Sequence, residues 1–357
     1  MNKPKLDHLY RMTDSVGILE HCVFVTPDRL EGYSTDDNAR ALQTFLRLKN
    51  PRISPYLEFL LRARTKKGFH QDLNADLTWK DDDEVKEGFG RAMAAMGEAS
   101  ITALENHQKL TAAFVFDAQL PLIKNVSDPR TIAQIITAVS YRIKFEDANP
   151  KLVPYLIMRK KLKADTGVKL LFNLKEETII LADRLVDHYH KNFTNSWKWY
   201  EDSLTYDNGR LPLGMFVAYE ATGDKKYLDI ALESLDFLIE KTYDSTKNYF
   251  SFPGYRGWFP KDGKKAVFGQ QPIEAGSMVE VLTKAYQVTN NKKYLDLAIK
   301  ALDWYSGKNI LGISLIDEST GGILDGLEQW GVNPNQGAES ILSYAIACLA
   351  FEKVKIG

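Results

Sequence analysis

The sequence predicts an all-α protein with the fold of an (α/α)6 toroid, in which six parallel inner helices are surrounded by outer helices that return antiparallel. Helical apolar patterns indicate about eleven or twelve helices, and helices that begin at a polar motif alternate with plain ones. Strand signals are limited to short runs such as 249–252 and 313–316, which we expect to form small hairpins on loops. We therefore expect a single domain over residues 1–357, with every polar motif at one mouth of the ring.

The order of the helices supports this arrangement. Helices that carry polar motifs are expected to begin near residues 36, 88, 128, 208, 272 and 337. Plain helices are expected between them, at about 56–65, 110–123, 150–163, 168–191, 225–241 and 292–305. The last two follow nearly identical phrases at 223–228 and 290–295, which indicates a duplicated helix-turn-helix unit. No C-terminal helix fills the sixth outer position, so residues 1–32 are expected to close the ring.

Composition and charge exclude several classes of protein. A chain of 357 residues with 44% hydrophobic residues can bury a large core, and its net charge of −1 without basic clusters argues against a nucleic-acid or anionic membrane surface. No apolar run reaches the eighteen residues of a membrane span. Two cysteines are too few for a disulfide scaffold, and the first residues lack the apolar core of a signal peptide. We expect a cytoplasmic protein.

The stretch 32–40, Gly-Tyr-Ser-Thr-Asp-Asp-Asn-Ala-Arg, is the motif around which the chain is organised. Ser34 or Thr35 can cap the helix that follows, and an acid in its first turn favours the positive end of the helix dipole. Capping needs only one acid, however, and leaves Tyr33, Asp36 and Asn38 unexplained. Because similar motifs begin the other inner helices, we interpret the stretch as functional.

The geometry of the ring would bring many carboxylates, arginines and aromatic rings to one mouth. The candidate catalytic residues are Asp36, Asp37, Glu201, Asp207, Glu274, Asp325 and Glu339. The candidate substrate-binding residues are Tyr33, Asn38, Arg40, Arg91, Trp199, Tyr206, Arg210, Trp258, Gln271, Trp330 and Asn335. Carboxylates beside planar rings are typical of a sugar site, and hydrolysis of a glycosidic bond needs two carboxylates. Each of these residues also has a structural explanation: Glu274 and Glu339 sit in first turns, the arginines can pair with neighbouring acids, and Trp199 can pack in the core.

Other chemistries lack their signatures. The sequence has no P-loop, no G-x-G-x-x-G after a strand and no G-x-S-x-G elbow, and its six histidines are scattered. We therefore expect neither a metal site nor a cofactor.

The motif at 32–40 resembles the signature of a family of six-hairpin glycosidase-like proteins, found alone or fused behind glycosyltransferases in prokaryotes. Further blocks that resemble the family lie at 90–92, 127–130, 204–208, 270–274, 321–327 and 335–340, so the resemblance spans nearly the whole chain. It implies an (α/α)6 fold, an oligosaccharide or glycoconjugate substrate and a glycosyltransferase as a candidate partner. Relatives tend to carry Glu-Asp before the Gly-Arg block, where this chain has Lys86-Glu87, and this departure weakens the case for Glu87 as a catalytic residue.

Three functions remain open from the sequence. The leading one is a glycoside hydrolase or related glycan-cleaving enzyme. The second is a sugar epimerase of the N-acylglucosamine 2-epimerase type, although no histidine begins an inner helix. The third is a non-catalytic glycan-binding module that serves a glycosyltransferase.

For hydrolysis, the positions of the acids suggest separate roles. Asp37 or Glu339 would be the base, because a helix N-terminus favours ionisation. Glu201 or Asp325 would be the acid, because loop and aromatic surroundings raise the pKa of a carboxyl group.

Overall fold

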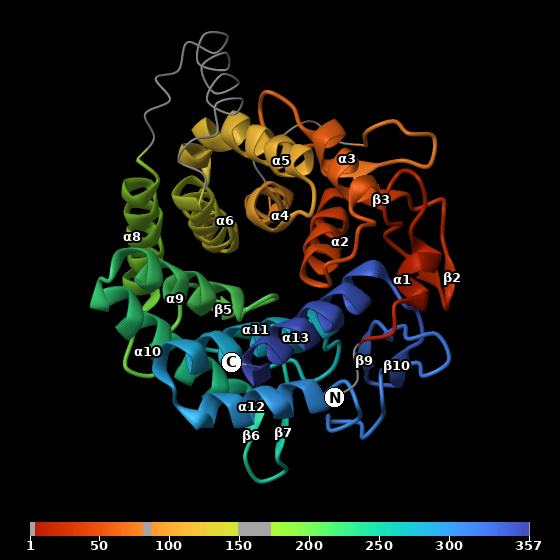
Figure 1. The fold of residues 1–357 in the computed structure, drawn as a ribbon. Helices are drawn as coiled ribbons and strands as arrows, with labels where there is room; N and C mark the ends of the chain where they lie inside the picture. Colours follow the sequence, from red (N-terminus) through yellow and green to blue (C-terminus); the bar gives the residue numbers. More distant parts are fainter. Residues whose placement is uncertain (1–3, 81–86, 149–172, 357) are drawn as a thin grey trace.

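The computed structural model describes residues 4–80, 87–148 and 173–356, and it shows a closed ring of six inner helices (Figure 1). These are α2 (Thr35–Arg47), α4 (Glu87–Thr102), α6 (Pro129–Ala148), α9 (Arg210–Thr222), α11 (Pro272–Thr289) and α13 (Ala338–Ile356). Each packs against the next, and α13 packs against α2 to complete the circle. The predicted (α/α)6 toroid is confirmed.

The outer helices pack against the outside of this ring. They are α3 (Ser54–Ala63), α5 (Asn106–Gln119), α8 (Leu174–Asn192), α10 (Lys225–Thr242) and α12 (Lys292–Asp303), and a 3-10 turn η1 (Leu120–Asn125) follows α5. The helix predicted at 150–163 lies outside the described residues. The repeated phrase acts as a cap in both places: Asp224 accepts from the Lys226 amide at the start of α10, and Asn291 accepts from the Lys293 amide at the start of α12.

The N-terminal segment bridges the first and last inner helices. Its helix α1 (Asp7–Met12) contacts α13. The Ile18 amide donates to Asn38 Oδ1 in α2 at 3.0 Å, and the Ala338 amide at the start of α13 donates to the Glu20 carbonyl at 3.0 Å. The segment therefore touches both sides of the junction where the ring closes.

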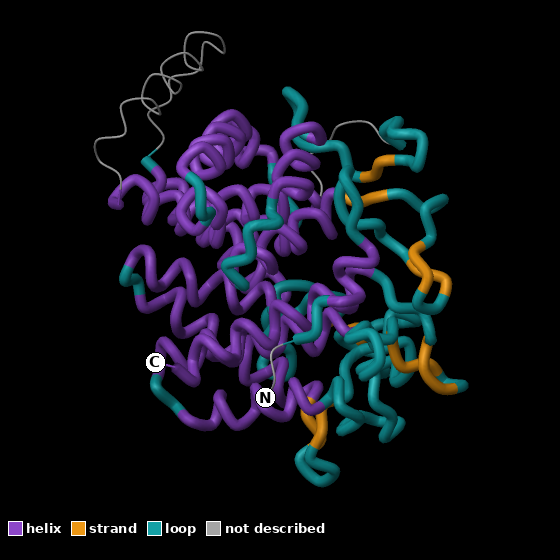
Figure 2. The backbone as a smooth tube through the Cα atoms, turned by 45° about the vertical axis from the view of Figure 1, so that its right-hand side comes forward, coloured by secondary structure: helices purple, strands orange, loops and turns teal. Residues whose placement is uncertain are grey.

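Short antiparallel strand pairs gather at one end of the ring, as Figure 2 shows. The pairs are β1 (Cys22–Val23) with β2 (Thr26–Pro27), β3 (Tyr33–Ser34) with β4 (Asp72–Leu73), β5 (Ser203–Leu204) with β8 (Phe259–Pro260), β6 (Tyr243–Asp244) with β7 (Tyr249–Phe250), and β9 (Gly326–Glu328) with β10 (Gly331–Asn333). The predicted run at 249–252 contributes β7. The run at 313–316 forms no strand, and only Ile316 pairs, in an isolated bridge with Ile323.

Close contacts between small residues hold the inner helices together. A Cβ built on Gly97 of α4 would lie 2.6 Å from the Ala138 carbonyl oxygen of α6, and one on Gly214 of α9 would lie 2.7 Å from the Ala133 Cβ. Glycine at these positions lets the helix backbones approach closely. In the described part of the chain, no helix is both long and apolar enough to cross a membrane.

Candidate active site

The first inner helix begins with a cap that also fixes an acid. Ser34 is extended and its hydroxyl oxygen accepts from the Asp37 amide at 3.1 Å, while the hydroxyl donates to Asp37 Oδ2 at 3.0 Å. Arg40 lies one turn later and donates to Asp37 Oδ1 at 2.8 Å. The other end of its guanidinium donates to Glu339 Oε2 at 2.9 Å. Arg40 therefore joins α2 to α13, and the predicted proximity of Asp37 and Glu339 is found in the structure.

A second arginine joins the next two carboxylates. Arg91 of α4 donates to Glu87 Oε1 at 2.6 Å, and its Nε lies 3.7 Å from Asp36 Oδ2. The side chains of Asp36 and Glu87 are each 21% exposed, while that of Arg91 is buried. Asp36 Oδ1 is buried without a hydrogen-bond partner among the described residues. The pair is thus partly open to solvent and partly unsatisfied.

The loop before α9 supplies a buried cluster. Asp207 is fully buried, with Oδ2 at 3.1 Å from Arg91 and 3.3 Å from Arg210. Its amide donates to Glu274 of α11, which also accepts from Asn208 at 2.8 Å. Asp207 has a φ of 47°, in the left-handed region that side chains rarely adopt. These contacts fix the loop against α4 and α11.

Aromatic rings line the neighbouring part of the mouth. Tyr206 donates its hydroxyl hydrogen to Glu87, and its ring lies 6.1 Å from that of Trp258. The Arg130 guanidinium lies 4.7 Å from the centre of the Tyr206 ring and pairs with Glu201 at 2.9 Å. The rings of Tyr206 and Trp258 are half-buried, so part of each ring surface is free for a ligand.

The last inner helix begins beside Asp325, which reaches it from the preceding loop. Asp325 Oδ1 accepts from the Gly337 amide at 2.8 Å and from the Ser340 hydroxyl at 2.5 Å. His21 of the N-terminal segment lies 3.4 Å from Glu20, and the hydrogen bond with Glu20 raises the pKa of His21 to about 9. The negative charges of Asp37 and Asp325 also raise the pKa of His21, so this side chain responds to the carboxylates of the mouth.

The pKa values of the carboxyl groups are shifted in opposite directions. Burial raises the pKa of Asp36 to about 6, that of Asp37 to about 7 and that of Glu274 to about 8. Burial also acts on Glu87 and Asp207, but neighbouring arginines and, for Glu87, the Tyr206 hydroxyl outweigh it and lower their pKa values. For Asp37, burial therefore opposes the ionisation expected from the helix N-terminus, and it has the largest effect on the pKa of this carboxyl group. Burial raises the pKa of Asp325 as predicted.

The structure places several predicted ligand-binding residues away from the open mouth. Trp199 is fully buried and its ring packs beside Tyr200 and Phe237, so it belongs to the core and cannot serve as a wall for sugar rings. Tyr33 is 5% exposed and donates to Asp14 at 2.8 Å. Both residues are corrections to the predicted substrate-binding set: Trp199 packs among aromatic rings, and Tyr33 lies in β3 against β4 with its ring 6.3 Å from that of Phe59.

Two predicted amides also act within the fold. Asn38 is fully buried. Its amide oxygen accepts from the Ile18 backbone amide, and its amide nitrogen donates to the Ser34 carbonyl oxygen. Asn335 accepts from the Phe24 amide at 2.9 Å. Gln271 is the half-buried N-cap residue of α11, and Trp330 is 70% exposed in the turn between β9 and β10. Of these four residues, only Gln271 and Trp330 have side chains without a hydrogen bond to another described residue.

Glu87 and His21 lie at this mouth but are not among the predicted site residues. The signal for Glu87 was its position, four residues before Arg91 in a first turn, which is the spacing of a helical ion pair. His21 carried no local signal, since the segment around it is irregular. In the described ranges, no group of three or more histidine, cysteine, aspartate or glutamate side chains is arranged to hold a metal ion.

Comparisons with known proteins agree with this fold. Residues 172–308 match the family model described as beta-L-arabinofuranosidase, GH127 catalytic domain, which is less than half of the chain. A comparison with curated proteins gave no match.

Solved structures resemble the chain over nearly its whole length. A cellobiose 2-epimerase from Bacillus thermoamylovorans B4167 has a TM-score of 0.70 at 14% identity and covers 99% of this chain and 96% of its own. A D-mannose isomerase has a TM-score of 0.69 at 12% identity, covering 98% and 96%. An inactive variant of the α-1,6-mannanase GH76A of Salegentibacter sp. HEL1_6, in complex with α-1,6-mannotetrose, has a TM-score of 0.59 at 11% identity, covering 98% and 96%. These likenesses show the same (α/α)6 toroid fold and leave the reaction open.

Proposed function

We propose that this chain is a carbohydrate-active enzyme that hydrolyses a glycosidic bond of an oligosaccharide or glycoconjugate at the mouth where the inner helices begin. The GH127 family-model match and the glycoside hydrolases among the proteins of similar fold support a carbohydrate substrate. The observation that carries the reaction type is the pair Asp36 and Glu87, which share Arg91 while the pKa of Asp36 is raised and that of Glu87 is lowered.

Two carboxyl groups with separated pKa values are what glycoside hydrolysis requires. Asp36, with a pKa raised to about 6 and a side chain that is 21% exposed, would give its proton to the leaving oxygen as the glycosidic bond breaks. Glu87, with a lowered pKa, would stay ionised. It would either take a proton from the attacking water or bond to the anomeric carbon itself. Arg91 would orient both groups.

The surrounding residues suit the binding of sugar rings. Tyr206 and Trp258 would stack on the apolar face of a pyranose or furanose next to Glu87. The partly exposed Glu201, Asp325 and Glu339 would bind hydroxyls, with Gln271 and Trp330 farther out. Buried Asp37, Asp207 and Glu274 would position Arg40, Arg210 and the loop before α9 rather than touch the substrate.

An epimerase is the alternative that the similar solved structures suggest. That chemistry needs a base that removes a proton beside a carbonyl. Within the described residues no histidine begins an inner helix, and His21 is held protonated by Glu20. Hydrolysis fits this site better, because Asp36 and Glu87 together supply the acid and the ionised carboxylate that cleavage of a glycosidic bond requires.

We also propose a cytoplasmic location, since Cys22 and Cys348 are free and buried, and a glycosyltransferase as partner on the strength of the family resemblance.

The test is Asp36→Asn and Glu87→Gln with a panel of oligosaccharides and glycoconjugates, with products followed by mass spectrometry. Each substitution should lower turnover by roughly 10²–10⁴-fold, as loss of a general acid or base does. The exposed Asp202 provides a matched control, and Asp202→Asn should keep wild-type turnover.

Deuterium incorporation next to the anomeric carbon in D₂O, without cleavage, would identify an epimerase instead. Hydrolysis that persists at wild-type rate in both folded variants would remove the pair from the mechanism.

A further inference from the structure

A large cavity opens at the end of the ring opposite the polar motifs. Its volume is about 950 Å³, and all six inner helices line it. Its rim includes the exposed residues Lys144 and Lys353, near the C-terminal ends of α6 and α13, and Lys49, just beyond the end of α2. Its floor is formed by Arg40, Arg91 and Arg210. The same arginines bind the carboxylates of the candidate active site, so they separate the two spaces.

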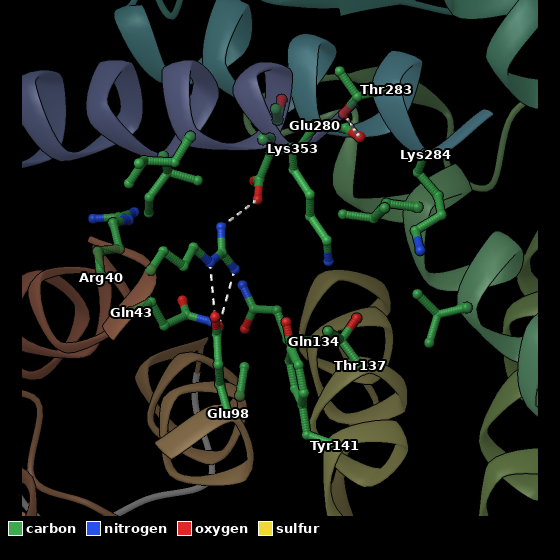
Figure 3. Close-up of a pocket in the computed structure, with 18 of the residues that line it drawn as sticks. Arg40, Gln43, Glu98, Gln134, Thr137, Tyr141, Glu280, Thr283, Lys284 and Lys353 are labelled. Atoms are coloured by element: carbon green, nitrogen blue, oxygen red, sulfur yellow. Dashed lines mark hydrogen bonds and ion pairs between the residues drawn. The ribbon is translucent and has the colours of Figure 1, made fainter. Parts of the chain in front are cut away.

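The deep wall of the cavity contains a side-chain amide whose polar atoms make no hydrogen bond to the described residues. Gln134 of α6 is 3% exposed, and neither its Oε1 nor its Nε2 has a hydrogen-bond partner among the described residues. Burial of an amide without partners is unfavourable, because neither its oxygen nor its nitrogen recovers the hydrogen bonds that it makes with water in the unfolded chain. Figure 3 shows Gln134 among the side chains that surround the cavity. A ligand with hydroxyl groups would satisfy both atoms at once.

Other deep polar groups are already paired and form a fixed frame. Arg47 binds Glu98 at 2.8 Å and Glu280 at 3.2 Å, and Arg210 binds Glu280 at 2.8 Å. Their charges are balanced within the cavity wall. Gln134 differs from these ion-paired residues, because both polar atoms of its side chain lack a partner among the described residues, and it therefore indicates where a ligand would sit.

The rim adds positive charge. Lysines near helix C-termini are common because they complement the helix dipole, so their presence alone does not indicate a ligand. Lys353 differs, because its side chain extends into the cavity in Figure 3 and its ammonium has no ion-pair partner among the described residues. Burial lowers the pKa of Lys353, and the charges of Lys284, Arg47 and Lys144 lower it further. Of these cations, Lys284 pairs with Glu220 at 3.0 Å.

We propose that this cavity binds a sugar derivative that carries an anionic group, with the anion beside Lys353 and Lys144 and the hydroxyls at Gln134. An anion would relieve the repulsion among the rim cations, and hydroxyls both donate to and accept from an amide. The volume accommodates a molecule of monosaccharide or disaccharide size. The site is separate from the proposed active site and does not depend on its reaction.

Isothermal titration calorimetry with glucose 6-phosphate, glucuronate and unmodified glucose tests the proposal. At least one of the two anionic sugars should bind, and glucose should bind at least roughly tenfold more weakly. Lys353→Met should weaken binding of the anionic sugar by roughly tenfold or more, and Lys353→Arg should largely restore it. Lys355→Met, the same change two residues later and outside the cavity lining, is the matched control and should bind as wild type.

Gln134→Leu gives an independent readout. It should abolish most of the binding while leaving the melting temperature of the unliganded protein unchanged or higher, because it removes a buried amide without partners. Asp36→Asn should leave binding of the anionic sugar intact, which separates this site from the proposed active site. No heat with either anionic sugar, or equal binding by wild type, Lys353→Met and Gln134→Leu, would overturn the proposal.

Discussion

Asp36 and Asp37 are neighbours in the sequence, but their side chains meet different surroundings. Asp37 turns into the ring, where it is 3% exposed and held by Ser34 and Arg40. Asp36 stays partly open beside Arg91. A helix N-terminus stabilises a charge by only about 0.3–1 kcal/mol at an exposed site, and burial of the carboxyl exceeds this. The sequence shows that both acids lie in a first turn, but it does not show how deeply each is buried.

Tyr206→Phe tests how Glu87 is kept ionised. The change removes the hydroxyl that donates to Glu87 and keeps the ring beside Trp258. The pKa of Glu87 should rise, so the acidic limb of the pH profile of kcat/KM should move to higher pH. KM near the optimum should change less than threefold, an estimate on the order of 0.6 kcal/mol, because stacking is retained. An unchanged acidic limb would show that Glu87 does not govern it.

At the scale of the helices, local signals predicted where each inner helix begins. The six expected starts lie within two residues of those observed, since caps, prolines and first-turn acids act over a few residues. Pairings between distant loops could not be predicted in this way. Examples are β5 with β8 and the ion pair between Arg130 and Glu201, both of which depend on how the ring closes. The burial of Trp199 is a further case.

Gly97→Ala tests the close packing of α4 against α6. Alanine favours a helix by about 1 kcal/mol over glycine, but its Cβ would lie 2.6 Å from the Ala138 carbonyl oxygen. We expect a net loss of about 1–3 kcal/mol in the free energy of unfolding, measured by urea denaturation. Gly276→Ala should cost less, because its nearest contact, the Ser343 carbonyl oxygen, would be at 3.0 Å. A gain in stability for Gly97→Ala would show that the two helices can separate without cost.

For the whole molecule, the alternation of motif-bearing and plain helices predicted the toroid and the gathering of carboxylates at one mouth. It could not predict which acids remain accessible, or that a second cavity opens at the opposite end. Gln134 lies inside α6 and Lys353 lies in the last turn of α13, and neither position has a distinctive sequence pattern. They line the same cavity only because the ring closes. A binding site at that end could not be predicted from sequence motifs, because the residues inside a helix carry no capping or loop signal.

The buried carboxyl groups also make the stability of the whole ring depend on pH. Asp36, Asp37 and Glu274 have folded-state pKa values of about 6, 7 and 8, all above their ordinary values. Each therefore contributes stability that is fully present below its unfolded pKa and is lost as the pH rises through the folded one. Glu87 and Asp207 have lowered pKa values, so their contribution is present at neutral pH and is lost in acid.

The protein should accordingly be most stable near pH 5 and should weaken toward pH 8. We expect the melting temperature to fall by roughly 5 °C between these values, an order-of-magnitude figure for a few kcal/mol in a chain of this size. Differential scanning calorimetry across pH 3–9 would measure it, with His21→Ala as a comparison. The raised pKa of His21 adds to the loss above pH 6.5, so the variant should show a shallower decline there. A melting temperature that stays level or rises from pH 5 to pH 8 would mean that these carboxyl groups are ionised in the folded ring. Asp36 would then lose the basis for its role as proton donor.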